Sequence, residues 1–142
     1  MKPRFQHILM PVDFTEKNLS ALDLALDLAI LHHARVTLLH VVETIDVEPD
    51  DEMNRFYAKL EDRADSELER LSQSFVADHL TVDRKVRFGK RLHEIVSDAI
   101  ERNVDLIVMS SHKPDFRNPT QTWATLSYQV SMLCPCPVLL VK

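Results

Sequence analysis

The chain has 142 residues, which favours one domain large enough to bury a substantial core. Its net charge of −5 argues against a general nucleic-acid-binding surface. Its single glycine, Gly89, excludes the P-loop, the dinucleotide-binding fingerprint and the kinase glycine loop, because each of these needs several glycines.

The remaining composition is that of an ordinary globular protein. Apolar residues make up 45% of the chain, yet no apolar run approaches the length of ~18 residues that a membrane span requires. The N-terminal stretch has no apolar segment of the kind found in signal peptides. Two cysteines, one residue apart, cannot form a disulfide framework. We therefore expect residues 1–142 to form one cytoplasmic domain with no membrane or nucleic-acid partner.

The first part of the chain alternates strand and helix patterns. Residues 7–13 are typical of a short buried strand, and Thr15 is a candidate N-cap for a helix that ends near His32. The apolar residues of that helix recur at helical spacing, at Leu19, Leu22, Leu26 and Ala29. Residues 34–42 are almost continuously apolar, which predicts a second strand covered on both faces.

An acidic loop at residues 43–51 then leads into a long amphipathic helix. Its predicted buried stripe consists of Met53, Phe56, Leu60, Ala64, Leu68, Leu71 and Phe75. Between Glu43 and Asp78 there are 12 acidic and 4 basic residues, which is typical of a solvated helix surface. Residues 81–88 alternate polar and apolar side chains, so we expect a strand at the edge of the sheet that ends at Gly89.

The last part of the chain repeats the alternation. The next predicted helix stops at Asn103, before a buried strand at residues 104–109. Its apolar stripe consists of Leu92, Ile95, Val96, Ala99 and Ile100. A loop at residues 110–118 precedes one helix, with Trp123, Leu126, Val130 and Leu133 on its apolar face, and a final strand. Alternating strands and helices predict an α/β fold, a three-layer sandwich around a parallel sheet.

Two of the predicted strands end in small polar side chains. Asp13 ends the first strand, and Ser110 and Ser111 follow the fourth. Open α/β sheets bind their ligands at the carboxyl ends of the strands, so we expect both ends to line one crevice. The Asp13 carboxylate could bind a ribose hydroxyl or a metal ion, or it could bridge within its own turn.

Other chemistries have weaker support. Ser111 and His112 could form a nucleophile–base pair of a hydrolase, but no third group is evident to orient the imidazole, so we expect no enzyme activity. Cys134 and Cys136 supply two thiols where a zinc site needs four ligands, so we expect no metal. Four cations could contact a phosphate near the crevice: Lys90, Arg91, Lys113 and Arg117.

Three stretches together resemble the universal stress protein family over essentially the whole chain. They are Ile-Leu-Met-Pro-Val-Asp at residues 8–13, Val-Asp-Leu-Ile-Val-Met-Ser-Ser-His at residues 104–112, and Cys-Pro-Cys-Pro-Val-Leu-Leu-Val at residues 134–141. The resemblance implies a Rossmann-like fold, similar to adenine nucleotide alpha hydrolases, with five parallel strands in the order 3-2-1-4-5. It also implies a homodimer joined through the last strand, Val138–Val141.

Members of that family that bind ATP are similar in carrying Gly-x-x-Gly, nine residues, and then Gly-Ser or Gly-Thr. Here Ser110 and Lys113 match the first two glycines, and Ala124-Thr125 matches the final pair, with ten intervening residues. The side chains of Lys113 and Ala124 would crowd a phosphate cradle, and Pro114 and Pro119 remove two backbone donors. The nucleoside end could persist, because residues that match Pro11, Val12, Asp13 and Val41 line the adenosine pocket of relatives.

The resemblance and the missing glycines favour a dimeric stress-response or regulatory module, with a protein partner and no tightly bound ATP or other cofactor. The alternative is a member that binds ATP or AMP through a divergent, glycine-free phosphate loop. The candidate nucleotide crevice consists of Pro11, Val12, Asp13, Val41, Met109, Ser110, Ser111, His112, Lys113, Ala124 and Thr125.

Overall fold

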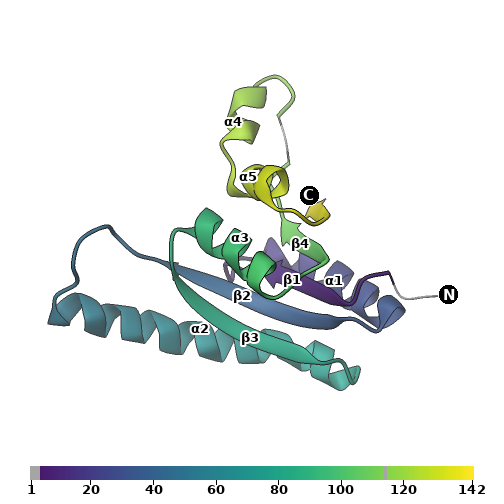
Figure 1. Cartoon of the computed structure of the whole chain (residues 1–142), viewed down its shortest axis with the longest axis horizontal. Helices are drawn as coiled ribbons and strands as arrows, with labels where there is room; N and C mark the ends of the chain where they lie inside the picture. Colours follow the sequence, from purple (N-terminus) through teal and green to yellow (C-terminus); the bar gives the residue numbers. More distant parts are fainter. Residues whose placement is uncertain (1–3, 114) are drawn as a thin grey trace.

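The computed structural model describes residues 4–113 and 115–142, and it shows five strands and five helices in these ranges (Figure 1). In chain order the elements are β1 (His7–Pro11), α1 (Asn18–His32), β2 (Arg35–Glu43), α2 (Asp51–Ala77), β3 (Val82–Gly89), α3 (Arg91–Glu101), β4 (Leu106–Ser110), α4 (Pro119–Trp123), α5 (Leu126–Leu133) and β5 (Val138–Val141). All strands pair in parallel in the order β3-β2-β1-β4-β5. This confirms the predicted α/β fold and strand order.

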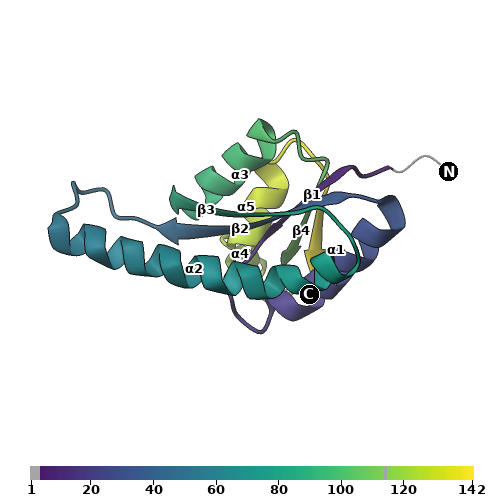
Figure 2. The same ribbon diagram turned by 90° about the horizontal axis from the view of Figure 1, so that it is seen from below.

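The helices form two layers, with α1 and α2 on one face of the sheet and α3 and α5 on the other (Figure 2). Successive residues of the central strand β1 enter different cores. Ile8 and Met10 pack toward α1 and α2, whereas Leu9 packs toward α3 and α5, and all three are fully buried. Burial on both faces explains why the central strands are almost continuously apolar. No helix of the described residues has the length and apolar character to cross a membrane.

The first helix begins later than predicted and buries a different stripe. Helix α1 starts at Asn18, and Thr15 does not cap it, because the Thr15 hydroxyl donates to Asp13 instead. The residues at the centre of the buried face are Asn18 and three alanines, Ala21, Ala25 and Ala29. Leu19, predicted to be buried, is mostly exposed. Small side chains on this face let the helix lie close to the sheet.

The second helix is longer than the sheet that it covers. In Figure 1 the first turns of α2 extend well past the carboxyl end of β2. Its fully covered residues are all in its second half, from Ala64 to Phe75. The prediction that Phe56 belongs to the buried stripe is therefore wrong, because its side chain is 57% exposed.

The remaining helices differ from the predictions at their ends. Ile100 of α3 is exposed, whereas Asp98 is buried, so the predicted stripe of α3 is partly wrong. Asn103 adopts a left-handed conformation (φ 53°) just beyond α3, as expected of a stop residue. The predicted final helix is two helices, because Thr125 caps α5 and interrupts the run after α4. The side chain of Trp123 and the position of Pro114 lie outside the described residues.

The only glycine of the chain ends the edge strand β3, where it is needed. Gly89 has a φ of 146°, which side-chain-bearing residues rarely adopt, and a Cβ there would come within 3.0 Å of Glu94 Cγ. This tight turn brings β3 beside α3. Arg87 then contacts three carboxylates of α3, those of Glu94 at 3.3 Å, Asp98 at 3.2 Å and Glu101 at 2.9 Å.

Replacing Arg87 by leucine should destabilise the fold by about 3 kcal/mol, because the almost fully buried Asp98 loses one of its two cationic partners. The hydrogen bond from Arg87 lowers the pKa of the exposed Glu101 carboxyl, so the small part of the contribution that comes from the Arg87–Glu101 pair is present above the ordinary glutamate pKa of about 4.3 and disappears as the pH falls through the lowered value. Urea unfolding should therefore show a difference between wild type and variant that narrows in acid.

A matched control is Arg84→Leu on the same strand. The guanidinium of Arg84 lies 3.8 Å from Glu69 and both side chains are exposed, so its loss should cost less than about 1 kcal/mol. Equal losses of stability for the two variants would contradict a special role for the Arg87 cluster.

Candidate functional site

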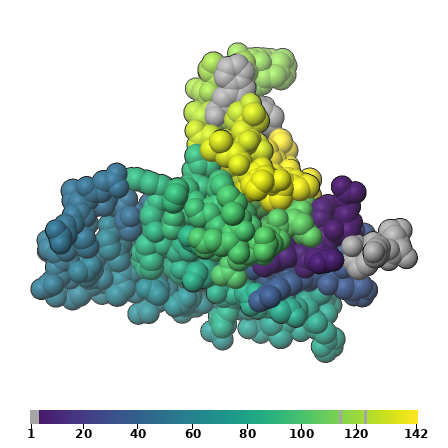
Figure 3. Space-filling view, viewed as in Figure 1, coloured from purple at the N-terminus to yellow at the C-terminus, as the bar shows by residue number. Residues whose placement is uncertain are grey.

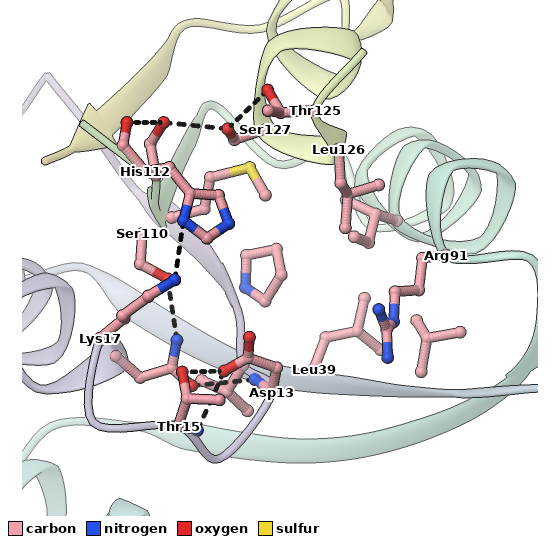
Figure 4. Close-up of a pocket in the computed structure, with 17 residues that line it drawn as sticks. Asp13, Thr15, Lys17, Leu39, Arg91, Ser110, His112, Thr125, Leu126 and Ser127 are labelled. Atoms are coloured by element: carbon pink, nitrogen blue, oxygen red, sulfur yellow. Dashed lines mark hydrogen bonds between the residues drawn. The ribbon is translucent and has the colours of Figure 1, made fainter. Parts of the chain in front are cut away.

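A cavity of about 250 Å³ lies at the carboxyl ends of β1 and β4 (Figure 4). The residues around it come from the ends of β1, β2 and β4 and the first turns of α1, α3 and α5: Pro11, Val12, Asp13, Thr15, Lys17, Asn18, Leu39, Val41, Arg91, Ile95, Met109, Ser110, Ser111, His112, Thr125, Leu126 and Ser127. Nine of the eleven candidate residues from the sequence lie in this set. Lys113 and Ala124 are outside it.

One wall of the crevice is apolar. It is built on the α3 and α5 side of the sheet from Leu39, Val41, Ile95 and Met109, all buried, together with the half-buried Leu126. An apolar slot of this kind suits a flat ring better than a charged group, because charged groups lose their hydration there.

Asp13 stands at the opposite, polar side of the crevice. One oxygen of its carboxylate accepts hydrogen bonds from the backbone N–H of Thr15 at 3.0 Å and from the Thr15 hydroxyl at 2.7 Å. Burial would raise the pKa of Asp13, but these hydrogen bonds outweigh burial and hold the pKa below its ordinary value. Asp13 is therefore an anion that bridges its own turn and keeps acceptor capacity toward the crevice.

Asn18 holds this turn in place, and the sequence analysis missed it. Its side-chain oxygen accepts from the backbone N–H groups of Asp13 at 2.9 Å and Phe14 at 3.0 Å, and its amide donates to Ser110 Oγ at 2.9 Å. The residue is only 3% exposed. It therefore ties the end of β1 to the end of β4. The available signal was an amide at the start of the helical spacing that continues with three alanines.

The same turn carries an unusual backbone conformation. Phe14 has a φ of 64°, in the left-handed region that residues with a Cβ seldom occupy. Its ring stacks on His40, with 4.4 Å between the ring centroids. His40 Nδ1 lies 2.8 Å from the carbonyl of Val12, which can only accept, so this nitrogen carries the hydrogen. Burial lowers the pKa of His40, which keeps the ring neutral at pH 7.

A group of polar side chains lines the end of the crevice near α5. Lys17 Nζ lies 2.7 Å from His112 Nδ1, which must accept because the ammonium only donates. The hydroxyls of Ser111 and Ser127 are 3.0 Å apart. Thr125 caps α5 by accepting from the backbone N–H of Tyr128 at 3.4 Å. These side chains are already hydrogen-bonded to one another or to the backbone.

Two cations face the crevice from opposite sides, and the sequence analysis anticipated only one of them. Figure 4 shows Lys17 on the side of α1 and Arg91 on the side of α3. Lys90, the neighbour of Arg91, lies instead near Asp46 at 3.8 Å. Lys113 and Arg117 belong to an exposed loop that leads away from the sheet to α4 (Figure 1). Neither of these two loop cations lines the cavity.

Comparison with known proteins places this geometry in a family. The family model described as "Universal stress protein family" matches residues 4–142. The chain belongs to the universal stress protein family. It is 25% identical to universal stress protein YxiE of Bacillus subtilis, with 97% of this chain and 99% of that protein covered.

Solved structures that resemble this chain agree in fold. The protein UspA of Lactobacillus plantarum superposes with a TM-score of 0.76 at 23% identity, with coverage of 98% of this chain and 99% of that one. The structure of the hypothetical protein MJ0577 has a TM-score of 0.83 at 27% identity, with coverage of 97% and 96%. These likenesses extend over nearly the full length of each chain.

Hydrolase and metal chemistry gain no support from the geometry of this universal stress protein. The Ser111 hydroxyl lies 3.3 Å from the carbonyl of His112, while the imidazole of His112 is engaged by Lys17. Among the described residues, no group of three or more His, Cys, Asp or Glu side chains is placed to hold a metal ion. Burial raises the pKa of the Cys134 thiol to about 11, so it is protonated at pH 7.

Asn18→Ala should destabilise the protein by roughly 2–3 kcal/mol, because it leaves the N–H groups of Asp13 and Phe14 without their acceptor. Urea unfolding measures the loss, and amide hydrogen exchange should report faster exchange at Asp13 and Phe14. The exposed Asn54→Ala is the matched control. A loss below about 0.5 kcal/mol, equal to that of the control, would show that Asn18 does not hold the crevice together.

Proposed function

We propose that this universal stress protein is a dimeric stress-response module that regulates through contacts with other proteins and does not bind ATP tightly. The observation that carries the proposal is the state of the crevice near α5. Side chains bonded to one another, Lys17 with His112 and Ser111 with Ser127, stand where a triphosphate would need free donors. A phosphate would have to break these contacts before it could form its own.

The loop after β4 and the size of the cavity also argue against tight ATP binding. A phosphate cradle uses successive backbone N–H groups that approach the ligand closely, which glycines permit. This loop has none, and its residues from His112 to Asn118 that the structure describes are all exposed. The cavity of about 250 Å³ is also below the ~300–1,000 Å³ typical of sites for whole small-molecule ligands.

A second candidate function is the binding of a nucleoside monophosphate such as AMP. The apolar slot, the Asp13 carboxylate and two cations, Lys17 and Arg91, favour it. The slot would take the base, Asp13 would accept from ribose hydroxyls, and one cation would suffice for one phosphate. Two more distant relatives are described as complexes with cAMP and with dAMP, at 16% and 18% identity, and each ligand has one phosphate.

Calorimetric titration of the nucleotide-stripped protein with Mg-ATP should give no measurable heat, because the crevice offers no cradle for three phosphates. An ATP-binding relative measured in the same buffer provides the control. Micromolar affinity for ATP would overturn the first proposal.

Titration with AMP tests the second candidate in the same experiment. If AMP binds, Lys17→Met should weaken binding about tenfold, because a charge-assisted hydrogen bond is worth roughly 1.5–3 kcal/mol. Lys113→Met, which changes a cation outside the cavity, should leave the affinity unchanged. Equal effects of the two substitutions would contradict the assignment of Lys17 to the phosphate.

The proposed dimer joins two copies through β5, which is one edge of the sheet. Dimers are common in this family. The edge is apolar over all four residues of β5, and an unpaired apolar edge invites pairing with another strand. Two copies related by a two-fold axis would pair their β5 strands antiparallel. Leu140 and Val138 pack into the core, whereas Leu139 is 37% exposed and free to face a partner.

Leu139→Lys should therefore convert the dimer into a monomer, because it places two ammonium groups at one contact. Light scattering at micromolar concentration should give about twice 16.4 kDa for the wild type and 16.4 kDa for the variant. Leu31→Lys on α1 is the control, since Leu31 is an exposed helix residue that is not part of the β5 edge. A monomeric wild type would refute the proposed dimer.

A further inference from the structure

The outer part of α2 and the loop before it form an arm that projects beyond the sheet. We define the arm as residues 43–60, which are the β2–α2 loop and the first turns of α2. Figure 3 shows it as the lobe at the left of the molecule, and Figure 1 shows the loop running out above the helix. Helix α2 has 27 residues and spans ~40 Å, whereas β2 has nine residues and spans ~30 Å.

The arm is held in a defined shape. Asp50 caps α2 by accepting from the backbone N–H of Met53 at 2.8 Å. The Tyr57 hydroxyl accepts from the backbone N–H of Ile45 at 3.4 Å, which fastens the loop to the helix. The Tyr57 ring meets the ring of Phe88 on β3 edge-on, with 6.4 Å between centroids. The arm is therefore braced against the sheet at its base.

Large apolar side chains remain exposed on this arm. Ile45 and Val47 of the loop are each 58% exposed and Phe56 of α2 is 57% exposed, while Phe88 at the base is 38% exposed. Phe56 lies beside Tyr57, with 6.1 Å between ring centroids, and Tyr57 is in turn bonded to the backbone of Ile45, so these exposed residues are linked within one small part of the molecule. Several large exposed apolar side chains gathered on one projecting part of a protein are a feature of interaction sites.

The charge of the arm restricts what can cover this surface. Residues 43–60 contain six acidic and two basic residues, a net charge of −4 out of −5 for the whole chain. Lys90 of the neighbouring turn approaches Asp46 at 3.8 Å and offsets part of this charge, while Glu48 lies directly beside Val47. Acidic residues thus outnumber basic ones three to one on the arm, and the two basic residues, Arg55 and Lys59, both lie next to Phe56 on the helix.

This charge disfavours several occupants. Two arms of two copies would bring like charges together, so self-association through the arm is opposed. Anionic lipid surfaces and nucleic acids are repelled for the same reason. A segment that is apolar on one face and basic on the other has complementary charge and can cover Ile45, Val47 and Phe56 at once.

We propose that the arm is a docking surface for a basic, amphipathic helical segment of a partner protein. Phe56 is its central apolar anchor, Ile45 and Val47 extend the apolar contact, and the net negative charge of the arm selects basic partners. This surface is separate from the nucleotide crevice, so it holds whether or not the crevice binds a nucleotide.

The test uses fluorescent peptides of about 18 residues, which is about five helical turns. The first peptide has leucine on one helical face and lysine on the other. The second has glutamate in place of every lysine, and the third is a scramble of the first. Fluorescence anisotropy with the full-length protein should show binding of the first peptide in the tens of micromolar, at least about tenfold tighter than the other two, and weaker at higher salt.

Variants of the protein locate the contact. Phe56→Ser should weaken binding of the lysine peptide about fivefold or more, because a central aromatic anchor is removed. Leu31→Ser changes an exposed apolar residue outside the arm and should leave binding unchanged. If Phe56→Ser lowers the melting temperature, a double variant of the loop, Ile45→Ser with Val47→Ser, replaces it. This variant leaves α2 intact and should weaken binding of the lysine peptide in the same way.

Several outcomes would overturn the proposal. These are equal affinity for the lysine and glutamate peptides, no binding of the lysine peptide up to millimolar concentration, and equal weakening by the Phe56 and Leu31 variants. Light scattering provides a further one: if Phe56→Ser reduces the oligomeric mass, a second copy of the chain covers the arm. Binding to anionic lipid vesicles that depends on Phe56 would likewise replace the peptide partner with a membrane.

Discussion

The parallel pairing of β1 with β4 at the centre of the sheet determines where the site lies. Ile8 pairs with Leu106 and Leu9 with Ile107, so the chain must leave both strands at the same edge. The connections run in opposite directions from this point, with β2 and β3 on one side and β5 on the other. A gap between the two connections is unavoidable in this topology, and it is where open α/β sheets bind ligands. Asn18 spans the gap from β1 to β4, so a single buried amide sets the shape of the crevice.

The shortage of glycine is the second constraint on the chain. Its one glycine is used for the turn from β3 into α3, where φ is 146° and Glu94 leaves no room for a Cβ. No glycine remains for the loop after β4, which runs outward to α4. Side chains, and not backbone N–H groups of this loop, therefore line the crevice. Backbone donors bind a phosphate in a fixed arrangement, whereas Lys17 and His112 must exchange their mutual contact for the ligand. The crevice therefore has a buried apolar wall, and the proposed function follows from its poorer environment for a triphosphate.

The sequence was sufficient to predict the order of the elements apart from the division of the last helix into α4 and α5, because the central strands are buried on both faces and the helices are amphipathic. It failed where two patterns fit the same spacing. In α1 the leucines and the alanines both recur at helical intervals, and the bulkier Leu19 was preferred although close packing on the sheet favours Ala21. Asn18 belongs to the alanine spacing, so its burial could be predicted only together with that of the alanines. Lys17 joins His112 across 95 positions of the chain, a contact that only the fold creates.

The crevice and the arm meet at the start of α3. Arg91 lines the crevice and lies 3.9 Å from Glu43 at the base of the arm, so a phosphate in the crevice and the Glu43 carboxylate compete for one guanidinium. Both side chains are about half exposed, and an exposed ion pair contributes no more than about 1 kcal/mol. A ligand that removed this pair could change the affinity of the arm by a factor of about five at most, since 1.4 kcal/mol is needed for tenfold. The two surfaces are therefore nearly independent, and the partner that we propose for the arm does not require an occupied crevice.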